Sequence, residues 1–367
     1  FLFFPAISYG ADRYWVGAGT GATANWNTTA SWSTTSGGAS GASVPGASDA
    51  AIFDGGNSMV GGVTVDATVS VVSITITAGY TGGGANDGEI NTGAYTITTS
   101  GALAMAAGKI TRASGNLTIA ANSINNTGGS ITTTTSGTIA INSTGTVGSF
   151  TLNTITSVST ISIGSTTAPS AVTINGTVSA GGIISIYSNS DITQNAGITS
   201  NSGASNVYFY PDVDNIGGAA TFTRTSGVIT ANNTYFYFPA SATTAFTLAG
   251  LDSSLGTTNF IDVGVATATS PVSVSITGAV TSNSSIAIRS LGNITQNADI
   301  DANSGADNVS FYPDVDNSGT ATFTRTSGII IATSISFSFP ASATTAFTLA
   351  GIDASAGTTN TIGVGAD

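Results

Sequence analysis

The chain has 367 residues, of which only 7% are charged, and 18 acidic against 6 basic side chains give a formal net charge of −12. This acidity excludes nucleic acid as a partner, since binding it needs a basic surface that releases phosphate counterions. The sequence holds neither cysteine nor histidine, which excludes disulfides, thiolate chemistry and histidine as a general base or zinc ligand.

The first residues form an apolar segment, 1–11, that resembles the end of a secretory signal peptide without its basic start. Three interpretations stay open: a signal remnant, a strand folded onto its own chain, and a strand donated to a neighbouring subunit. The apolar side chains that would make such a subunit contact are Phe1, Leu2, Phe3, Phe4 and Ile7. No later run of about 18 apolar residues follows, so no transmembrane span is expected.

Residues 12–66 hold all the tryptophans of the chain, Trp15, Trp26 and Trp32. A stack of strands ends in a turn with unpaired backbone groups, which most such proteins cover. We therefore predict that this segment is an N-terminal cap.

From residue 67 to 367, short segments of alternating apolar and polar residues return every 21 to 29 residues, from Ile76 and Ile97 through Phe238 to Phe339 and Val364. This spacing is about one turn of a β-solenoid, and helix signals are nearly absent. The sequence thus predicts an all-β fold, a parallel β-helix (β-solenoid) of about thirteen turns. Ladders of like residues should fill its core, and the expected phenylalanines are Phe209, Phe222, Phe236, Phe238 and Phe246, repeated as Phe311, Phe323, Phe337, Phe339 and Phe347.

Two long copies, about 171–271 and 272–367, lie within this region. Ile192 matches Ile294 at an offset of 102, and Pro239 matches Pro340 at an offset of 101. Each full copy should comprise four turns, and the second one is incomplete. We expect the last turn, with Ile362 and Val364, to present a strand edge to further chain or to another subunit.

Two stretches carry a resemblance to a known class of proteins. The start, RYWVGAGTGATANWNTTASWSTTSGGASGASVPGASDAAIFDGG (13–56), resembles the N-terminal capping region of exported bacterial β-solenoids of the autotransporter-passenger type. Turns such as GIISIYSNSDITQNAGITSNSG resemble those passengers and the filamentous-haemagglutinin-like adhesins. The resemblance implies export, a right-handed parallel β-helix and a role at the cell surface or in a fibre. It implies no catalytic residues.

Acidic turns occur once in each copy, where two carboxylates two residues apart precede a glycine, as in oxygen-rich calcium loops. The candidate calcium ligands are Asp212 and Asp214, matched by Asp314 and Asp316. The alternative is an Asp/Asn turn at a solenoid corner. Calcium is the one cofactor that the sequence suggests.

Tyrosines alternate with the inward phenylalanines of the first copy and should therefore face outward. Tyr208, Tyr210, Tyr235 and Tyr237 lie on neighbouring turns, where they would bind glycans, contact another subunit, or simply form surface. In the second copy three of the four are replaced by serine, which argues against a site shared by both copies.

Arginine recurs in the motif TFTRTSG, at Arg224 and Arg325. An inward guanidinium needs a partner, and the preceding acidic turn would offer Asp214 or Asp316; the alternative is a solvent-exposed strand end. A catalytic arginine beside paired carboxylates is the least favoured interpretation.

These features favour a non-enzymatic, secreted or cell-surface protein that serves as a structural or adhesive fibre subunit and binds chiefly to itself. The alternatives are a monomeric adhesin stalk or passenger fragment that binds host or matrix glycans, and an enzyme of the pectin-lyase-like class. Such an enzyme would need clustered carboxylates, for which Asp212 and Asp214 are the main candidates.

Overall fold

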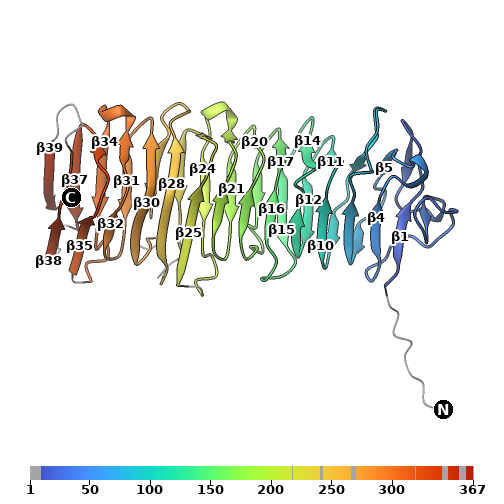
Figure 1. The fold of residues 1–367 in the computed structure, drawn as a ribbon, viewed down its shortest axis with the longest axis horizontal. Helices are drawn as coiled ribbons and strands as arrows, with labels where there is room; N and C mark the ends of the chain where they lie inside the picture. Colours follow the sequence, from blue (N-terminus) through green and yellow to red (C-terminus); the bar gives the residue numbers. More distant parts are fainter. Residues whose placement is uncertain are drawn as a thin grey trace, which may run out of the picture. The chain divides into compact units, whose positions relative to one another are not determined.

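The computed structural model describes residues 10–216, 218–239, 243–265, 270–318, 320–340, 346–354 and 361–366. The chain is all-β, a parallel β-solenoid of about 12 turns with almost no helix, as the sequence predicts. It falls into two compact units, one up to Val158 and one from Ser159 onward. In each unit the strands of successive turns lie side by side (Figure 1).

The first unit has three sheets, and from β4 onward the chain visits them in the same order in every turn. Apart from one antiparallel strand, β3, the strand pairs within them are parallel. Its first sheet contains β1 (Asp12–Trp15), β3 (Trp32–Ser33), β4 (Ala50–Phe53), β7 (Ser73–Ile76), β10 (Ala102–Met105), β13 (Ser123–Asn125) and β16 (Phe150–Leu152). The second contains β2 (Thr23–Asn25), β5 (Gly62–Thr64), β8 (Glu89–Asn91), β11 (Lys109–Arg112), β14 (Ser130–Thr133) and β17 (Thr154–Ser157). The third contains β6 (Val69–Val71), β9 (Ile97–Thr99), β12 (Leu117–Ala121) and β15 (Ile139–Ser143).

The second unit begins with the same order, but β28 and β30 are long, with 9 and 10 residues. The early part of β30 pairs with β32 and its late part with β33. The first sheet contains β19 (Val172–Ile174), β22 (Ile192–Gln194), β25 (Ala219–Arg224), β28 (Ala245–Ser253), β30 (Ser273–Ser282), β32 (Ile294–Gln296), β35 (Thr320–Arg325) and β38 (Ala346–Ala350). The second sheet contains β20 (Val178–Ala180), β23 (Ile198–Ser200) and β26 (Ile229–Thr230). The first sheet also takes in β33 (Ile300–Ala302), which pairs with the late part of β30, and β36 (Ile330–Ile331), which pairs with β33. The third contains β18 (Ile161–Ile163), β21 (Ile184–Tyr187), β24 (Val207–Tyr210), β27 (Asn233–Phe236), β29 (Phe260–Val263), β31 (Ile286–Arg289), β34 (Asn308–Tyr312), β37 (Ser334–Phe339) and β39 (Thr361–Ala366).

The strand register corrects one position in the predicted series of inward residues. Ile76 lies in β7 of the first sheet, whereas Ile97 lies in β9 of the third sheet. The residue that pairs with Ile97 from the preceding turn is Val69. Every second residue of a strand faces inward, so a period of two cannot tell which inward residue aligns with its neighbours.

The same ambiguity affects two phenylalanines. Phe236 pairs with Phe209 and Val263, and Phe337 pairs with Phe311 and Val364. Phe238 and Phe339, chosen from the sequence, lie one inward position further along. Phe238 is nevertheless buried, and its ring packs edge-on against Phe246 at 4.9 Å between centroids.

Ladders of like residues fill the core because in-register parallel strands place equivalent side chains one above another. Phe209 and Phe236 stack with their centroids 5.0 Å apart, and Phe222 meets both edge-on at 4.9 and 5.1 Å. Phe311, Phe323 and Phe337 repeat this cluster in the second copy. The predicted aromatic ladders are confirmed for these residues.

Corners of the solenoid fall at the polar turns. Besides η1 (Thr29–Ser31) and η2 (Gly56–Ser58), the short 3-10 turns η3 (Asn201–Gly203) and η5 (Asn303–Gly305) occupy equivalent corners of the two copies. Ser202 and Ser304 both have φ of +51°, a left-handed conformation that short polar side chains tolerate.

The tryptophans pack together at the start of the first unit. The Phe53 ring lies 5.7–5.8 Å from the rings of Trp15, Trp26 and Trp32, and the Trp32 indole N–H donates to the Trp26 carbonyl over 2.8 Å. β3 runs antiparallel to β1 on the side away from β4. That residues 12–66 act as a cap stays a prediction, as does the handedness of the coil.

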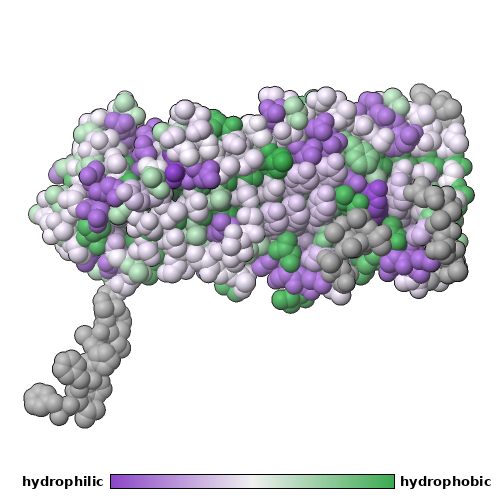
Figure 2. Space-filling model, turned by 180° about the vertical axis from the view of Figure 1, so that it is seen from behind, coloured by the Kyte–Doolittle hydropathy of each residue, from purple (hydrophilic) through white to green (hydrophobic). Residues whose placement is uncertain are grey.

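The surface has few strongly hydrophobic or strongly hydrophilic areas. On the face in Figure 2, most of the described surface is pale, with small strongly hydrophobic or hydrophilic areas. Within the described residues, no helix has the length and apolar character that crossing a membrane requires.

Candidate functional site

Five tyrosines form a continuous cluster on the outer side of the third sheet, which we call the tyrosine ladder. Its members are Tyr187 of β21, Tyr208 and Tyr210 of β24, Tyr235 of β27 and, just after β27, Tyr237. Tyr187 and Tyr210 are strand partners whose rings stack at 4.1 Å with an interplanar angle of 4°. Tyr210 stacks on Tyr237 at 5.4 Å, and Tyr208 on Tyr235 at 5.3 Å. The ladder thus spans three turns in two adjacent columns.

The rings use their faces to pack on one another, which changes the predicted role. A sugar ring stacks on an exposed aromatic face, whereas most faces in the ladder lie against the next tyrosine. All five side chains are partly exposed, so the ring edges and hydroxyls meet solvent. The structure brings the four predicted tyrosines together and adds Tyr187, although no binding function follows from this alone.

Burial raises the pKa of three of these phenols. The pKa of Tyr210 is raised, first by desolvation and then by the neighbouring Tyr187, which also shares a side-chain hydrogen bond with it. The pKa values of Tyr235 and Tyr237 are raised as well, chiefly by desolvation. Asn206 donates to the Tyr208 hydroxyl over 2.8 Å. The outer edge of the ladder therefore offers a row of hydroxyl groups.

The ladder ends on an ion pair that sequence reasoning missed. Asp262 pairs with Tyr235 in the strand register, and its carboxylate binds the guanidinium of Arg289. The guanidinium carbon of Arg289 in turn lies 4.5 Å from the centre of the Tyr312 ring, a cation–π distance. Desolvation raises the pKa of Asp262 to about 6, against the lowering influence of Arg289.

The signal for Tyr187 and for this ion pair was present in the spacing. When Ile186 is aligned with Phe209, the next residue, Tyr187, lies beside Tyr210. The same alignment, continued over the following turns, places Asp262 beside Tyr235. The prediction of outward tyrosines did not include this alignment and therefore missed Tyr187 and the ion pair.

The two carboxylates of each acidic turn differ in burial. Asp212 is fully buried and accepts a hydrogen bond from the Thr244 hydroxyl, whereas Asp214 is exposed and accepts from the backbone N–H of Ile216 over 3.2 Å. In the second copy Asp314 is buried and Asp316 is exposed, and both carboxylates accept from the backbone N–H of Ser318, over 2.8 and 3.3 Å. Among the described residues, no three or more acidic side chains gather as metal ligands would. Calcium binding stays a prediction, and so does the use of Asp212 and Asp214 as an enzymatic pair.

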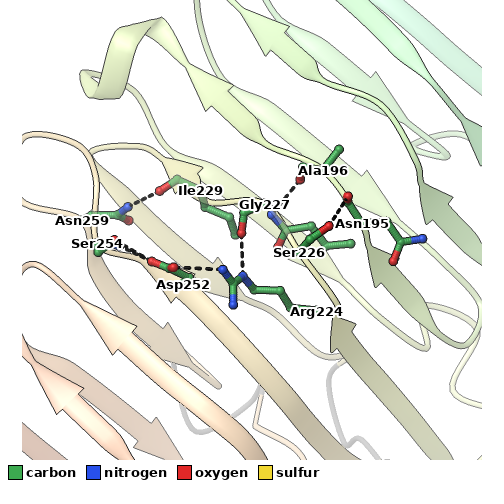
Figure 3. Close-up of polar contacts among 10 residues, drawn as sticks. Asn195, Ala196, Arg224, Ser226, Gly227, Ile229, Asp252, Ser254 and Asn259 are labelled. Carbon is green, nitrogen blue, oxygen red and sulfur yellow. Dashed lines mark hydrogen bonds and ion pairs between the residues drawn. The ribbon is translucent and has the colours of Figure 1, made fainter.

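The arginines of the repeated TFTRTSG motif bind partners other than the predicted ones. Arg224 donates through Nε to the Gly227 carbonyl over 2.6 Å and through Nη2 to Asp252 over 2.9 Å (Figure 3). Arg325 binds Gly328 and Asp353 in the same way. The prediction of Asp214 and Asp316 was wrong because each acidic turn precedes its strand, whereas the arginine ends the strand at the opposite corner.

The loop after each arginine is also fastened to the preceding turn. The Ser226 hydroxyl donates to the Asn195 carbonyl over 2.5 Å, and the Thr225 hydroxyl donates to the Asn195 side chain (Figure 3 shows the former). Each arginine and its loop therefore connect three successive turns, an arrangement that we call the arginine clamp.

The last turn exposes residues that belong to interior ladders. Ile362 aligns with the buried Ile335 and Val364 with the buried Phe337, yet their exposed fractions are 44% and 58%. Phe1, Leu2, Phe3, Phe4 and Ile7, the other predicted subunit contacts, lie outside the described residues.

Comparison of the chain with protein-family models, with curated protein sequences and with solved structures finds no match.

Proposed function

We propose that the chain is a non-enzymatic, extracellular β-solenoid with a structural or adhesive role, and that it forms fibres by end-to-end stacking of subunits. The observation that supports this proposal is an apolar strand edge that fits one more solenoid turn, either further along the same polypeptide or from another subunit. Leu248, Ile261 and Val263 are completely buried in the first copy. Their counterparts in the second copy are 37%, 44% and 58% exposed, and these are Leu349, Ile362 and Val364.

The strands that bury these side chains in the first copy indicate what kind of partner could cover their exposed counterparts. β30 pairs along β28, and β31 pairs along β29, so a complete further turn covers Leu248, Ile261 and Val263. β38 and β39 offer the same apolar side chains and the same kind of strand edge. Burying such side chains is worth about 25 cal/mol per Å² of apolar surface, and an open edge also provides backbone hydrogen bonds.

The occupant that we propose for this edge is the N-terminal part of a second copy. Its apolar segment Phe1–Ile7 would add as a strand, a mode of association that depends on backbone hydrogen bonds for affinity. The resemblance to exported bacterial solenoids supports an extracellular location for the resulting fibre.

Sedimentation and electron microscopy of the purified chain test this function. We expect filaments with an axial repeat close to one subunit length, and we expect Ile362→Asp to abolish them. Ile216→Asp is the matched control, because Ile216 is 82% exposed elsewhere on the surface and the variant adds the same charge. Single short rods at all concentrations would refute the stacking. Further solenoid turns encoded beyond Asp367 would favour the monomeric stalk instead.

The tyrosine ladder favours a second candidate function, glycan binding by an adhesin. Its outward row of hydroxyl groups can donate and accept hydrogen bonds along several turns. Tyr208→Phe and Tyr235→Phe remove these hydroxyls and keep the ring stacking, so a glycan that binds through them should lose affinity on a glycan array. Unchanged binding by both variants would exclude this use of the ladder.

A further inference from the structure

We propose that Tyr187 and Tyr210 form a site of oxidative cross-linking, at which a one-electron oxidant joins two neighbouring turns by a carbon–carbon bond between the two phenol rings. The site lies within the tyrosine ladder but requires neither a glycan nor a second subunit. It therefore goes beyond the proposed function and is independent of it.

Geometry singles out this pair. The two rings are nearly parallel, at 4°, and their centroids are 4.1 Å apart, the closest approach of any two tyrosine rings among the described residues. The side chains project from directly paired positions of β21 and β24, so the backbone already holds the rings in register. Both rings are partly exposed, which gives a small diffusible oxidant access to their edges.

The other tyrosines of the ladder can pass a radical to this pair. Tyr237 stacks on Tyr210 at 5.4 Å, and Tyr208 lies 6.4 Å from Tyr210. A phenoxyl radical formed on any of these rings is in contact with the next one. The radical therefore reaches Tyr210 without leaving the ladder.

The chemistry balances as follows. Each phenol gives one electron to the oxidant and loses its hydroxyl proton to water, which leaves two phenoxyl radicals. These couple at the ring carbons next to the hydroxyls, and the hydrogens on those carbons move to the oxygens, which restores both phenols. The net change is the loss of two electrons and two protons, with one new carbon–carbon bond. The oxidant can be an oxidised peroxidase haem, or an oxidised metal complex generated by light.

The second copy provides a natural control within the same chain. Tyr312 is the counterpart of Tyr210, but the position of Tyr187 is taken by Arg289, whose guanidinium carbon lies 4.5 Å from the Tyr312 ring centre. An arginine gives no phenoxyl radical. The second copy should therefore not cross-link at this position.

The test uses the purified chain and tris(bipyridine)ruthenium(III), generated by light and persulfate, a cationic one-electron oxidant that a protein of net charge −12 attracts. A protease that cuts before aspartate separates the two tyrosines, because Asp191 lies between them and Asp212 follows. We expect one peptide that joins residue 187 to residue 210, lighter by two hydrogen atoms than its parts, in protein that remains monomeric. Its yield should not change on tenfold dilution.

Variants identify the pair. Tyr187→Phe and Tyr210→Phe keep the stacked rings and should abolish the cross-link, whereas Tyr95→Phe, at an exposed tyrosine outside the ladder, should leave it unchanged. Arg289→Tyr should create a second cross-link, to Tyr312. The proposal is overturned if Tyr187→Phe retains the cross-linked peptide, if coupling occurs only between molecules, or if the wild-type chain yields no 187–210 link while other tyrosines couple.

Discussion

Single residues fix the order of the turns where a charged side chain binds across them. Arg224 bonds the loop that follows its own strand and the Asp252 carboxylate of the next turn, while the same loop holds Asn195 of the preceding turn. The guanidinium suits this task because its planar fork donates in several directions at once. Since the pair is partly exposed, its contribution to stability is that of a good surface interaction and not that of a buried ion pair.

Replacing Arg224 tests the clamp. Arg224→Met keeps most of the apolar stem but removes both hydrogen bonds, so the free energy of unfolding should fall by about 1 kcal/mol. Arg325→Met should cost less, because the Asp353 side chain is 34% exposed against 23% for Asp252. Urea denaturation followed by circular dichroism measures both. Equal stability of Arg224→Met and wild type would contradict the role of the clamp.

Asp262 should make stability depend on pH. Its pKa is raised from 3.8 to about 6 in the folded protein, first by desolvation, with Arg289 opposing and with Tyr235 and Tyr237 beside it. The folded state therefore binds the proton more tightly than the unfolded state, and this contribution is complete below pH 3.8 and is lost as pH rises through 6.

The matched variant for this pH dependence is Asp262→Asn, which keeps the shape and an oxygen that Arg289 can bind. Between about pH 4 and 7, the wild type should lose on the order of 2 kcal/mol relative to the variant. Urea midpoints measured across this range supply the difference. A difference that stays constant with pH, or one that grows in favour of the wild type, would show that Asp262 is not held in this way.

At the scale of elements, close contacts at the corners help to set how one turn of the solenoid aligns with the next. The loop after Arg224 passes so close to the preceding turn that a Cβ on Gly227 would lie 2.2 Å from the Ala196 carbonyl carbon, and Gly227 has φ of +84°. Gly328 repeats both features, with φ of +80° and the same distance to Ala298. Only glycine fits such a position, since both the backbone conformation and the space exclude a side chain.

Gly227→Ala should therefore destabilise the chain by more than about 1 kcal/mol, because it strains the backbone and forces two turns apart. Gly19→Ala is the control, since a Cβ at Gly19 meets nothing within 4 Å. Thermal unfolding of both variants provides the comparison. A Gly227→Ala protein that melts with the control would mean that the corner relaxes without cost.

Particular elements show how far the sequence predicts the fold and the sites. The alternating pattern and its spacing predict the solenoid, the inward phenylalanines and the polar corners, because in-register strands repeat the same chemistry on every turn. Alignment within a turn is harder, as Ile76 and Phe238 show, since neighbouring inward positions look alike. Partners across turns need that alignment first, which is why Asp252, and not Asp214, binds Arg224.

For the whole molecule, the stability of a solenoid is approximately the sum of its turns and of the contacts between neighbouring turns. A turn covered on both sides gains two such contacts, whereas a turn covered on one side gains one. The matched copies allow this difference to be measured within a single chain, because β29 and β39 have nearly the same inward residues but different surroundings.

Hydrogen exchange of these two strands should separate a stacked subunit from an isolated one. In dilute monomer, the amides of Thr361–Ala366 should exchange roughly 100-fold faster than those of Phe260–Val263. Local opening of the last turn breaks contacts on one side only, so it costs less free energy than opening a turn that is covered on both sides. In assembled filaments, the proposed neighbour adds the missing contact, so the two rates should converge, while Ile362→Asp should keep β39 fast under both conditions. If β39 is already as slow as β29 in dilute monomer, the terminal turn is covered by its own chain and end-to-end stacking is wrong. If it remains fast inside filaments, the subunits associate through another surface.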